Sequence, residues 1–306
     1  MNILIAGGAG FIGRALCKAL IQTNHGVTVL SRSPDAHRGD LPPSVTLLAW
    51  DGRSREGWTQ ELARVDAVIN LAGENIAEKR WTKNRKEELR SSRILATRLL
   101  VQAMAVLSKR PVILINASAI GYYGPRDETP VSEETPPGSD FLADLCVAWE
   151  REAIQAETLG LRVVRLRIGL VMGEDGGALP RMMLPFRFFL GGPISPGSQW
   201  VSWIHRQDLI GLIRWALTNP KVSGPVNAVA PGAVTMREFC RTLGQVLGRP
   251  SWLPVPEIAL RLGLGELAML LTTGQRVEPA AALREGHTFQ YPRLEQVLRE
   301  ILGKPL

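Results

Sequence analysis

Long apolar runs are missing from this sequence of 306 residues. No stretch approaches the roughly 20 apolar residues that a membrane-spanning helix needs, so we expect no membrane partner. The first apolar run is broken by glycines almost at once and has no basic leader, which is not the pattern of a signal peptide. Low-complexity segments are also absent, while a hydrophobic content of 45% is enough for a large core.

Cysteine is scarce. Cys17, Cys146 and Cys240 lie far apart, and no two of them form a C-x-x-C pair. This spacing argues against a disulfide framework and against a metal site. We expect reduced thiols that serve as packing residues in a cytoplasmic protein, and no bound metal.

Acidic residues are outnumbered, and the net charge is +7. The densest basic stretch runs from Glu78 to Arg98 and begins EKRWTKNRKEELR. A solvated helix face explains it, because Glu87 and Glu88 are placed to pair with nearby bases. No nucleic-acid motif accompanies it, so we expect no nucleic-acid partner. The phosphates of an anionic cofactor would account for part of the charge equally well.

The most informative stretch is the first thirteen residues, MNILIAGGAGFIG. Residues 3–6 form a short apolar run that predicts a buried strand, and helical apolar spacing follows the glycines. Gly7 permits a tight turn, Gly10 lets the backbone approach a pyrophosphate, and Gly13 lets the helix lie close to the sheet. The G-x-x-G-x-x-G spacing alone is weak, and a plain strand–helix turn is the alternative. The strand–turn–helix context favours dinucleotide binding.

The end of the second expected strand, residues 27–30, indicates which dinucleotide is bound. An acidic residue there would bind the ribose 2′-hydroxyl of NAD, whereas an arginine accommodates the 2′-phosphate of NADP. The acid is absent, and Ser31 and Arg32 stand in its place. We therefore expect NADP(H), with an ordinary surface arginine as the alternative explanation of Arg32.

Strand-like and helix-like segments alternate as far as residue 168, which predicts an α/β fold: a Rossmann-type doubly wound parallel sheet with a smaller mixed C-terminal substrate-side region. Further strands are expected at residues 45–48, 67–73, 112–117 and 162–168, and helices at residues 82–107, 142–158, 204–217, 235–248, 258–271 and 294–302. We expect an NADP-binding core at residues 1–172 with returning elements from about 203–230, substrate-side loops and helices at 173–250, and a helix-rich C-terminal domain at 251–306.

Ligands of such sheets sit outside the carboxyl ends of the strands. On that rule the expected cofactor-binding residues are Gly7, Gly10, Phe11, Ile12, Gly13, Ser31, Arg32, Asp51, Leu71, Ala72, Gly73, Glu88, Arg93, Ser118 and Leu170. Asp51 is placed to touch the adenine. Glu88 and Arg93 have surface positions on a helix as their alternative.

Several motifs together resemble a known family. GGAGFIG, the SRSP after the second strand, NLAG and SAIGYYG resemble the extended short-chain dehydrogenase/reductases. NLAGENIAEKRW, LPFRFFLGGPI and WIHRQD resemble their "epimerase family protein" branch, which is similar to nucleoside-diphosphate-sugar epimerases and has members labelled as cell-division inhibitors. The tail, with GQRVEPAAL and GHTFQYPRLEQVL, resembles the branch's own C-terminal domain. The resemblance covers the chain and implies a Rossmann-type core with bound NADP(H).

One departure from the family pattern concerns the chemistry. Typical members use a Tyr, a Lys four residues later and a Ser to move a proton. This chain has no Y-x-x-x-K, and on the family pattern Leu142 and Cys146 stand where the Tyr and Lys belong. The standard mechanism is therefore not supported. Ser118 matches the family's serine region.

Substitute groups are available near the expected nicotinamide and on the substrate side. The candidate catalytic residues are Ser118, Tyr122, Tyr123 and His205, and the candidate substrate-pocket residues are Glu74, Arg80 and Trp81. A histidine titrates near neutrality, although one at a helix start is often a cap. Each tyrosine has pocket packing as its alternative role.

Two functions follow from this balance. The first is an NADP(H)-dependent oxidoreductase or epimerase with a non-standard acid–base set. Its substrate is an unidentified small molecule, for which a sugar-nucleotide-like compound is one candidate. The second is a non-catalytic NADP(H) sensor that regulates a partner, with a link to cell division implied by the resemblance. A homodimer is left open as the state of assembly.

Overall fold

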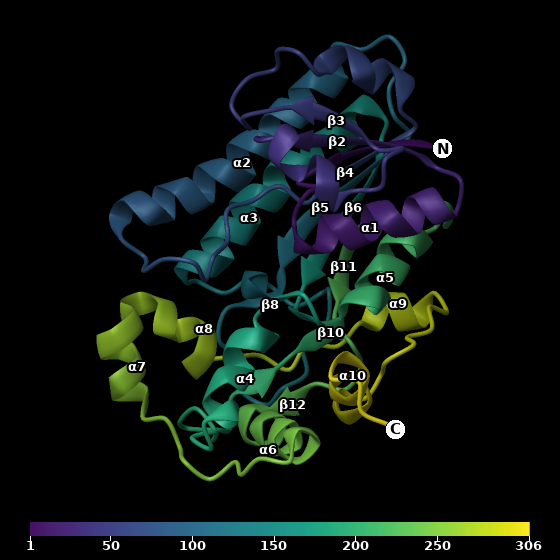
Figure 1. Ribbon diagram of the computed structural model, residues 1–306. Coiled ribbons are helices and arrows are strands. Elements are labelled where there is room, and N and C mark those ends of the chain that lie inside the picture. Colours follow the sequence, from purple (N-terminus) through teal and green to yellow (C-terminus); the bar gives the residue numbers. More distant parts are fainter. Residues whose placement is uncertain (306) are drawn as a thin grey trace.

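Seven parallel strands form the central sheet of the computed structural model, which describes residues 1–305 (Figure 1). Their order across the sheet is β11-β6-β5-β4-β1-β2-β3. The strands span β1 Asn2–Ala6, β2 Gly26–Ser31, β3 Thr46–Ala49, β4 Ala67–Asn70, β5 Ile113–Ala119, β6 Arg162–Ile168 and β11 Gly224–Ala228. The predicted doubly wound parallel sheet is thereby confirmed.

The direction of strand progression reverses at β1. From β1 the chain adds β2 and β3 on one side and then returns to add β4, β5 and β6 on the other. Ala6, the last residue of β1, pairs with Leu30 of β2 and with Asn70 of β4. This reversal is the topological switch point at which open α/β sheets bind their ligands.

Two layers of helices cover the sheet (Figure 1). Ile3 and Ile5 face α1 (Phe11–Gln22) and α5 (Arg206–Thr218), where they join one apolar cluster with Leu16 and Leu212. Leu4 of the same strand points the other way, toward α2 (Lys83–Ala105) and α3 (Phe141–Ile154). Burial of each such side chain contributes about 1.5–3 kcal/mol, so both faces hold the strands in register.

Among the described residues, side-chain caps begin four of the helices, and His205 at the start of α5 is one of them. Thr82 accepts a hydrogen bond from the backbone N–H of Arg85 at the start of α2, and Asp140 accepts one from Ala143 at the start of α3. At α6 (Met236–Leu247), Thr235 and Glu238 form a capping box, in which each side chain bonds the backbone N–H of the other residue.

A smaller mixed lobe lies below the carboxyl edge of the sheet (Figure 1). Its core joins Trp203, Phe239 and Leu298 from segments far apart in the sequence. Its strands are β7 Leu170–Gly173, β8 Gly176–Gly177, β9 Trp200–Val201, β10 Trp203–His205 and β12 Val234–Thr235, and its further helices are α4 Leu179–Arg187, α7 Glu257–Leu264, α8 Met269–Thr272, α9 Ala280–Arg284 and α10 Leu294–Ile301.

The structure differs from the expected elements in two places. The apolar stretch 258–271 is not one helix, because Gly265 ends α7 with φ +64° and a 3-10 turn precedes α8. The short strands β7 to β10 were not predicted, since they pair with distant partners instead of showing a period of their own. Within residues 1–305 no helix has the length and apolarity to cross a membrane. The last residue of the expected C-terminal domain, 306, lies outside the described residues.

Candidate cofactor and active site

The glycine turn after β1 is shaped by close backbone contacts. Gly7 has φ +77°, and a Cβ there would lie 2.7 Å from the Leu71 carbonyl oxygen. A Cβ on Gly13 would lie 2.5 Å from the Cα of Gly8, which was not among the expected residues. Side chains at these positions would push the turn away from β4 or from α1. The sequence signal for Gly8 is its place directly after Gly7, as the second glycine of the GG pair.

Gly10 differs from its neighbours because the space above it is open. A Cβ there would meet only the Gly7 carbonyl oxygen, at 3.4 Å. Gly10 is the N-cap of α1, and no side chain caps this helix. The N–H groups of the first turn therefore remain free for an anion, and the missing side chain leaves room for it. This cradle fits the pyrophosphate of a dinucleotide.

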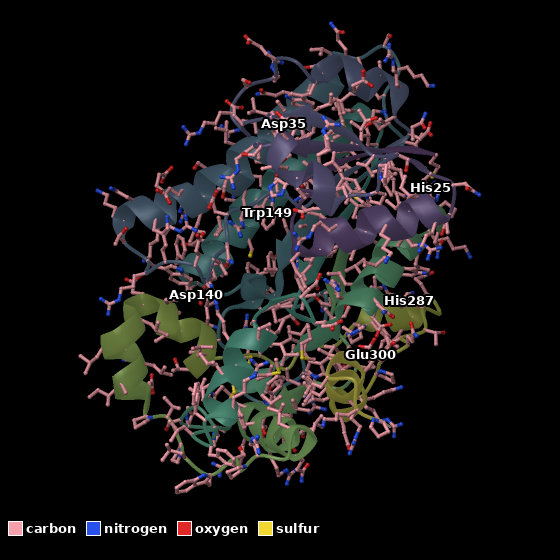
Figure 2. The ribbon with its side chains drawn as sticks, in the orientation of Figure 1. His25, Asp35, Asp140, Trp149, His287 and Glu300 are labelled. Carbon is pink, nitrogen blue, oxygen red and sulfur yellow. The ribbon has the colours of Figure 1, made fainter. Side chains whose placement is uncertain are left out.

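A buried polar cluster supports the neighbouring loop at the end of β4. Asn70 donates hydrogen bonds to Thr97 Oγ1 at 2.8 Å and to Asn116 Oδ1 at 2.7 Å, and its own oxygen accepts the N–H of Ala72 at 3.1 Å. The indole of Trp149 also donates to Thr97 at 2.9 Å (Figure 2). Asn70 thus fixes residues 71–73 against the glycine turn. A polar residue at the end of an apolar strand was the sequence signal for it.

Arg32 and Glu74 contact each other at the carboxyl edge of the sheet, beside the ends of β2 and β4. Ser31 is buried and its hydroxyl accepts the N–H of Ser33 at 3.2 Å, so the turn after β2 is ordered. Arg32 is exposed and forms an ion pair with Glu74, which was expected in the substrate pocket. Partial burial alone would raise the pKa of Glu74, but the guanidinium groups of Arg32 and Arg85 outweigh it and hold the pKa below its ordinary value.

Arg93 underlies the same loop from α2. Its guanidinium donates to the Glu74 carbonyl oxygen at 2.8 Å, and a Cβ on Gly73 would lie 3.0 Å from its Cζ. Its Cζ also lies 5.3 Å from the centre of the Trp149 ring. Burial lowers the pKa of Arg93. Arg93 is therefore a support of the loop as well as a cation near the cofactor edge.

Ser118 belongs to a buried charged network behind β5. Its hydroxyl donates to Glu150 Oε1 at 2.7 Å, and both residues are almost fully buried. The Glu150 carboxylate is also held by Arg167, at 2.9 Å and 3.0 Å, and by Arg165 at 3.2 Å. Such a carboxylate is stable in the interior only because these cations and the hydroxyl compensate its charge.

The two adjacent tyrosines have different environments. The Tyr123 hydroxyl is fully buried, donates to Asn227 Oδ1 at 2.6 Å and accepts from Arg167 at 2.9 Å. Burial raises the pKa of Tyr123 to about 12, which makes it a poor acid–base group near neutrality. Tyr122 is half-buried, with Arg167 Cζ 3.5 Å from its ring centre, and no described residue takes up its hydroxyl.

Leu142 and Cys146, which we expect at the positions of the family's Tyr and Lys, both lie against the turn after β5. A Cβ on Gly121 would be 3.2 Å from Leu142 Cβ and 3.9 Å from Cys146 Sγ, so both contact the turn after β5. Burial raises the pKa of the Cys146 thiol to about 12. Leu142 has no ionisable group, and the Cys146 thiol stays neutral, so neither side chain supplies a positive charge to this turn.

His205 lies apart from the other candidate catalytic residues. It caps α5, because Nδ1 accepts the N–H of Gln207 at 3.3 Å. Its Nε2 lies 3.1 Å from Glu300 of α10, which is labelled in Figure 2. Burial lowers the pKa of His205 to about 4. Nδ1 is an acceptor, so the neutral ring donates from Nε2 to the Glu300 carboxylate. This contact joins α5 to the C-terminal helix, and a catalytic role for His205 stays a prediction without support from these contacts.

Arg80 and Trp81 face the C-terminal lobe. Arg80 donates to the carbonyl oxygens of Gly263, at 2.8 Å, and of Leu262. Trp81 is buried in an apolar cluster with Leu145 and Leu267, and its indole donates to the Ile76 carbonyl oxygen at 3.0 Å. The 74–81 loop is thereby joined to α7 and the turn after it, and the expected pocket-lining role of these two residues stays a prediction.

The remaining predicted residues lie around the carboxyl edge of the sheet, on neighbouring turns and helices. The Asp51 carboxylate accepts the N–H groups of Arg53 and Ser54, which lowers its pKa and orders the turn after β3. Glu88 pairs with Arg85 at 2.8 Å. The other three sit at packing positions: Phe11 against the β7–β8 hairpin, Ile12 in the α1–α5 cluster and Leu170 in β7, paired with Trp203.

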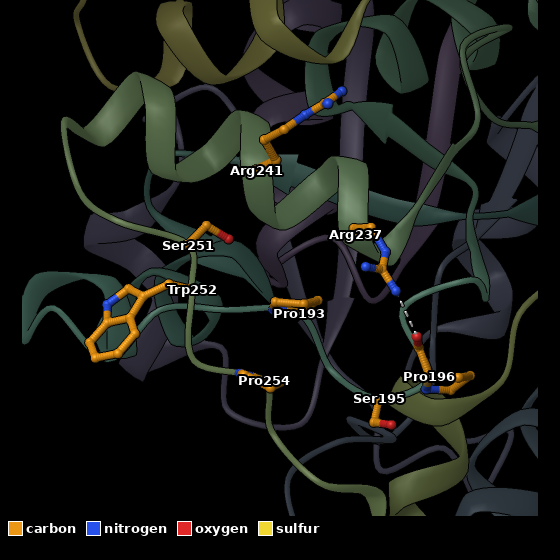
Figure 3. A pocket seen from close by; sticks show the side chains of 8 residues that line it. All are labelled: Pro193, Ser195, Pro196, Arg237, Arg241, Ser251, Trp252 and Pro254. Atoms are coloured by element: carbon orange, nitrogen blue, oxygen red, sulfur yellow. Dashed lines mark hydrogen bonds between the residues drawn. The ribbon is translucent and has the colours of Figure 1, made fainter.

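A hollow on the C-terminal lobe lies apart from these residues. It has a volume of about 500 Å³ and lies between residues 193–196, α6 and residues 251–254. Arg237 turns toward the Pro196 carbonyl oxygen, 3.4 Å away, while Arg241 and Trp252 point away from one another (Figure 3). These side chains do not converge on a common ligand position.

The chain is similar to known proteins over its whole length. The family model described as NAD dependent epimerase/dehydratase matches residues 3–229, and a domain of unknown function (DUF1731) matches residues 255–301. Epimerase family protein YfhF of Bacillus subtilis is 41% identical, covering 99% of this chain and 98% of its own. The chloroplastic SDR39U1 homolog of Arabidopsis thaliana is 40% identical, covering 99% and 87%. The crystal structure of human SDR39U1 with NADPH superposes with a TM-score of 0.85 at 34% identity, covering 100% of both chains.

Proposed function

The chain belongs to the NAD-dependent epimerase/dehydratase family, and we propose that it binds NADP(H) and acts as an oxidoreductase or epimerase on an unidentified small molecule. The open cradle above Gly10, with Arg32 at the end of β2, is the observation that carries the cofactor assignment. A relative solved with NADPH supports it. When bound, NADP(H) would supply or accept the hydride.

Tyr122 is the proton-transfer group that we assign in this proposal. Its hydroxyl follows β5 at the carboxyl edge, and no described residue takes it up, whereas the hydroxyls of Tyr123 and Ser118 already donate inside the protein. Arg167 lies against the Tyr122 ring. A cation there stabilises negative charge as the phenol gives up its proton, which is the charge that the missing Lys would have supplied.

A substrate would lie beside Tyr122, under the loop of residues 74–81 and the turn before α3. A sugar-nucleotide-like molecule is the class that the epimerase relatives' names suggest. We also propose a cytoplasmic location, on the three free and buried thiols of Cys17, Cys146 and Cys240. The domain boundaries given by the sequence remain part of this proposal.

A regulatory NADP(H)-binding protein is the second candidate function. It is favoured by Leu142 and Cys146, which leave no standard acid–base pair at the turn after β5. In that case the cofactor would bind without turnover, and the bound state would be read by a partner.

One experiment separates the two functions. Binding of NADPH, NADP, NADH and NAD is measured by calorimetry, and oxidation of NADPH at stoichiometric protein is then followed by absorbance with carbonyl compounds and nucleotide sugars. We expect NADPH oxidation that falls about 100-fold or more in Tyr122→Phe, since a general acid contributes at least that much. Tyr291→Phe is the matched control, because the Tyr291 hydroxyl contacts Gln207 at the start of α5 and takes no part in the network around Tyr123. NADPH binding with no oxidation would favour the regulatory function, and no dinucleotide binding would overturn both.

A further inference from the structure

Arg32, which follows β2, pairs with Glu74 from the loop after β4. Glu74 follows the β4 loop, while Arg32 follows β2, where no acidic residue stands. The Arg32 side chain is 72% exposed and that of Glu74 is 21% exposed. NAD-binding folds place an acidic residue at the end of the second strand, where it meets the ribose 2′-hydroxyl. In this chain a carboxylate reaches the same place from the loop after β4.

Glu74 is held in this place by its backbone. Its N–H donates to Ser92 Oγ at 3.1 Å, and its carbonyl oxygen accepts from Arg93 at 2.8 Å. Both partners come from α2, which is anchored in the core. These contacts fix the backbone of Glu74, so its side chain keeps its starting point beside the turn after β2.

Arg85 compensates the same carboxylate from the opposite side. Its guanidinium lies 3.4 Å from Glu74 Oε2 and 2.8 Å from Glu88, and it donates to the Asn75 carbonyl oxygen at 2.7 Å. The Arg85 side chain is only 5% exposed, so it cannot turn outward to a ligand. Arg32 can turn outward and leave Glu74 with Arg85.

A phosphate bound by Arg32 comes within reach of the carboxylate that Arg32 now contacts. Like charges that share one guanidinium repel each other, and Arg85 offsets part of this repulsion. A ribose 2′-hydroxyl has the opposite preference, because it can donate a hydrogen bond to the same carboxylate.

We propose that Glu74 is a cofactor-specificity residue, which opposes the 2′-phosphate of NADP(H), accepts the 2′-hydroxyl of NAD(H) and so reduces the preference that Arg32 creates. The proposal rests on the proposed function, in that a dinucleotide must bind at this edge. It assigns the position to the cofactor site, where the sequence had placed Glu74 in the substrate pocket.

The test is calorimetric binding of NADPH and NADH to the full chain, with wild type, Glu74→Gln and Glu152→Gln compared. Glu152 is the matched control, since its side chain is 18% exposed and paired with Arg98 at 2.7 Å between α2 and α3. We expect Glu74→Gln to tighten NADPH about three- to tenfold, the size of a partly exposed charge interaction, and to weaken NADH. Glu152→Gln should change neither.

The outcomes are distinguishable from failure of the proposed function. Wild type that binds neither nucleotide would overturn the proposed function itself. Wild type that binds NADPH, with a NADPH-to-NADH affinity ratio unchanged or lowered in Glu74→Gln, would overturn the role of Glu74 alone. Arg32→Ala supplies the reference for the phosphate contact, because it should weaken NADPH and leave NADH unaffected.

Discussion

The hydroxyl of Ser118 donates a 2.7 Å hydrogen bond to the carboxylate of Glu150, and both groups are buried between β5 and α3. Glu150 in turn connects Ser118 to Arg167, and Arg167 connects to Tyr123 and to the face of Tyr122. Ser118 at the end of β5 and the two tyrosines after it resemble a catalytic set, but they belong to one buried network, and of these three described residues Tyr122 alone has its hydroxyl outside it.

Removing the charge of Glu150 should be strongly destabilising. Glu150→Gln leaves the buried Arg167 and the half-buried Arg165 without their counter-charge, and we expect a decrease of about 3–5 kcal/mol in the free energy of unfolding. Urea denaturation measures it. Glu152→Gln, which removes a pairing with the half-exposed Arg98, should cost at most about 1 kcal/mol. Equal effects of the two substitutions would contradict the network as described.

Two glycines of the turn should respond to alanine in opposite ways. Gly10 has φ −78° and open space, so Gly10→Ala should leave stability within about 1 kcal/mol of wild type. Its methyl group would occupy the cradle and weaken NADPH at least about tenfold, since a phosphate loses its close backbone contacts. Calorimetry and thermal unfolding on the same samples check both parts.

Gly13→Ala should act on the fold instead. Its Cβ would lie 2.5 Å from the Gly8 backbone, which forces α1 away from the turn and should cost about 1–3 kcal/mol. A stable Gly13→Ala protein, or a Gly10→Ala protein with full NADPH affinity, would show that the turn does not have this geometry in solution.

The local part of the site is predictable from the sequence, and the network is not. The residues of β1, Gly7, Gly10 and Gly13 lie within one strand–turn–helix unit, so their spacing reports their geometry directly. Tyr123 and Asn227 are separated by 104 residues, and Ser118 and Glu150 by 32. No local period indicates that such residues meet, because only the packing of several elements brings them together.

The same reason explains why the contacts of Glu74, Arg80 and Trp81 were not predicted from the sequence. Their proximity to NLAG predicts the correct edge of the sheet, whereas their partners come from β2 and from residues 262–267. The position of these residues close to NLAG therefore predicts where the loop lies. The orientation of each side chain depends on contacts with residues far away in the sequence, which the sequence does not reveal.

Trp81 should matter for stability. Its side chain packs with Phe141, 5.3 Å between ring centres, and with Leu267 of the C-terminal lobe. Trp81→Ala should lower the free energy of unfolding by about 3–5 kcal/mol because it leaves a cavity, and Trp81→Phe by less. Thermal and urea unfolding test this. If Trp81→Ala keeps full stability, the residue belongs to an open pocket, as the sequence had suggested.

His205 should make stability depend on pH in a defined window. Burial lowers its pKa from 6.5 to about 4, against the opposing charge of Asp208 and with a smaller contribution from Arg206. Between these two values the unfolded chain binds a proton at this position and the folded protein does not. The free energy of unfolding should therefore fall as the pH drops from about 6.5 to about 4, by up to about 3 kcal/mol, and this contribution should level off below.

The matched variant is His205→Asn, because asparagine also caps a helix but does not titrate. Glu300, which faces His205 from α10, and the lowered pKa values of His25 and His287 contribute to both proteins, so the difference between the two pH profiles isolates His205. The difference should be largest near pH 7, where neutral His205 donates to Glu300, and should shrink toward pH 4. Parallel profiles would mean that His205 titrates in the folded protein as it does in the unfolded chain, and that its ring is not enclosed between α5 and α10.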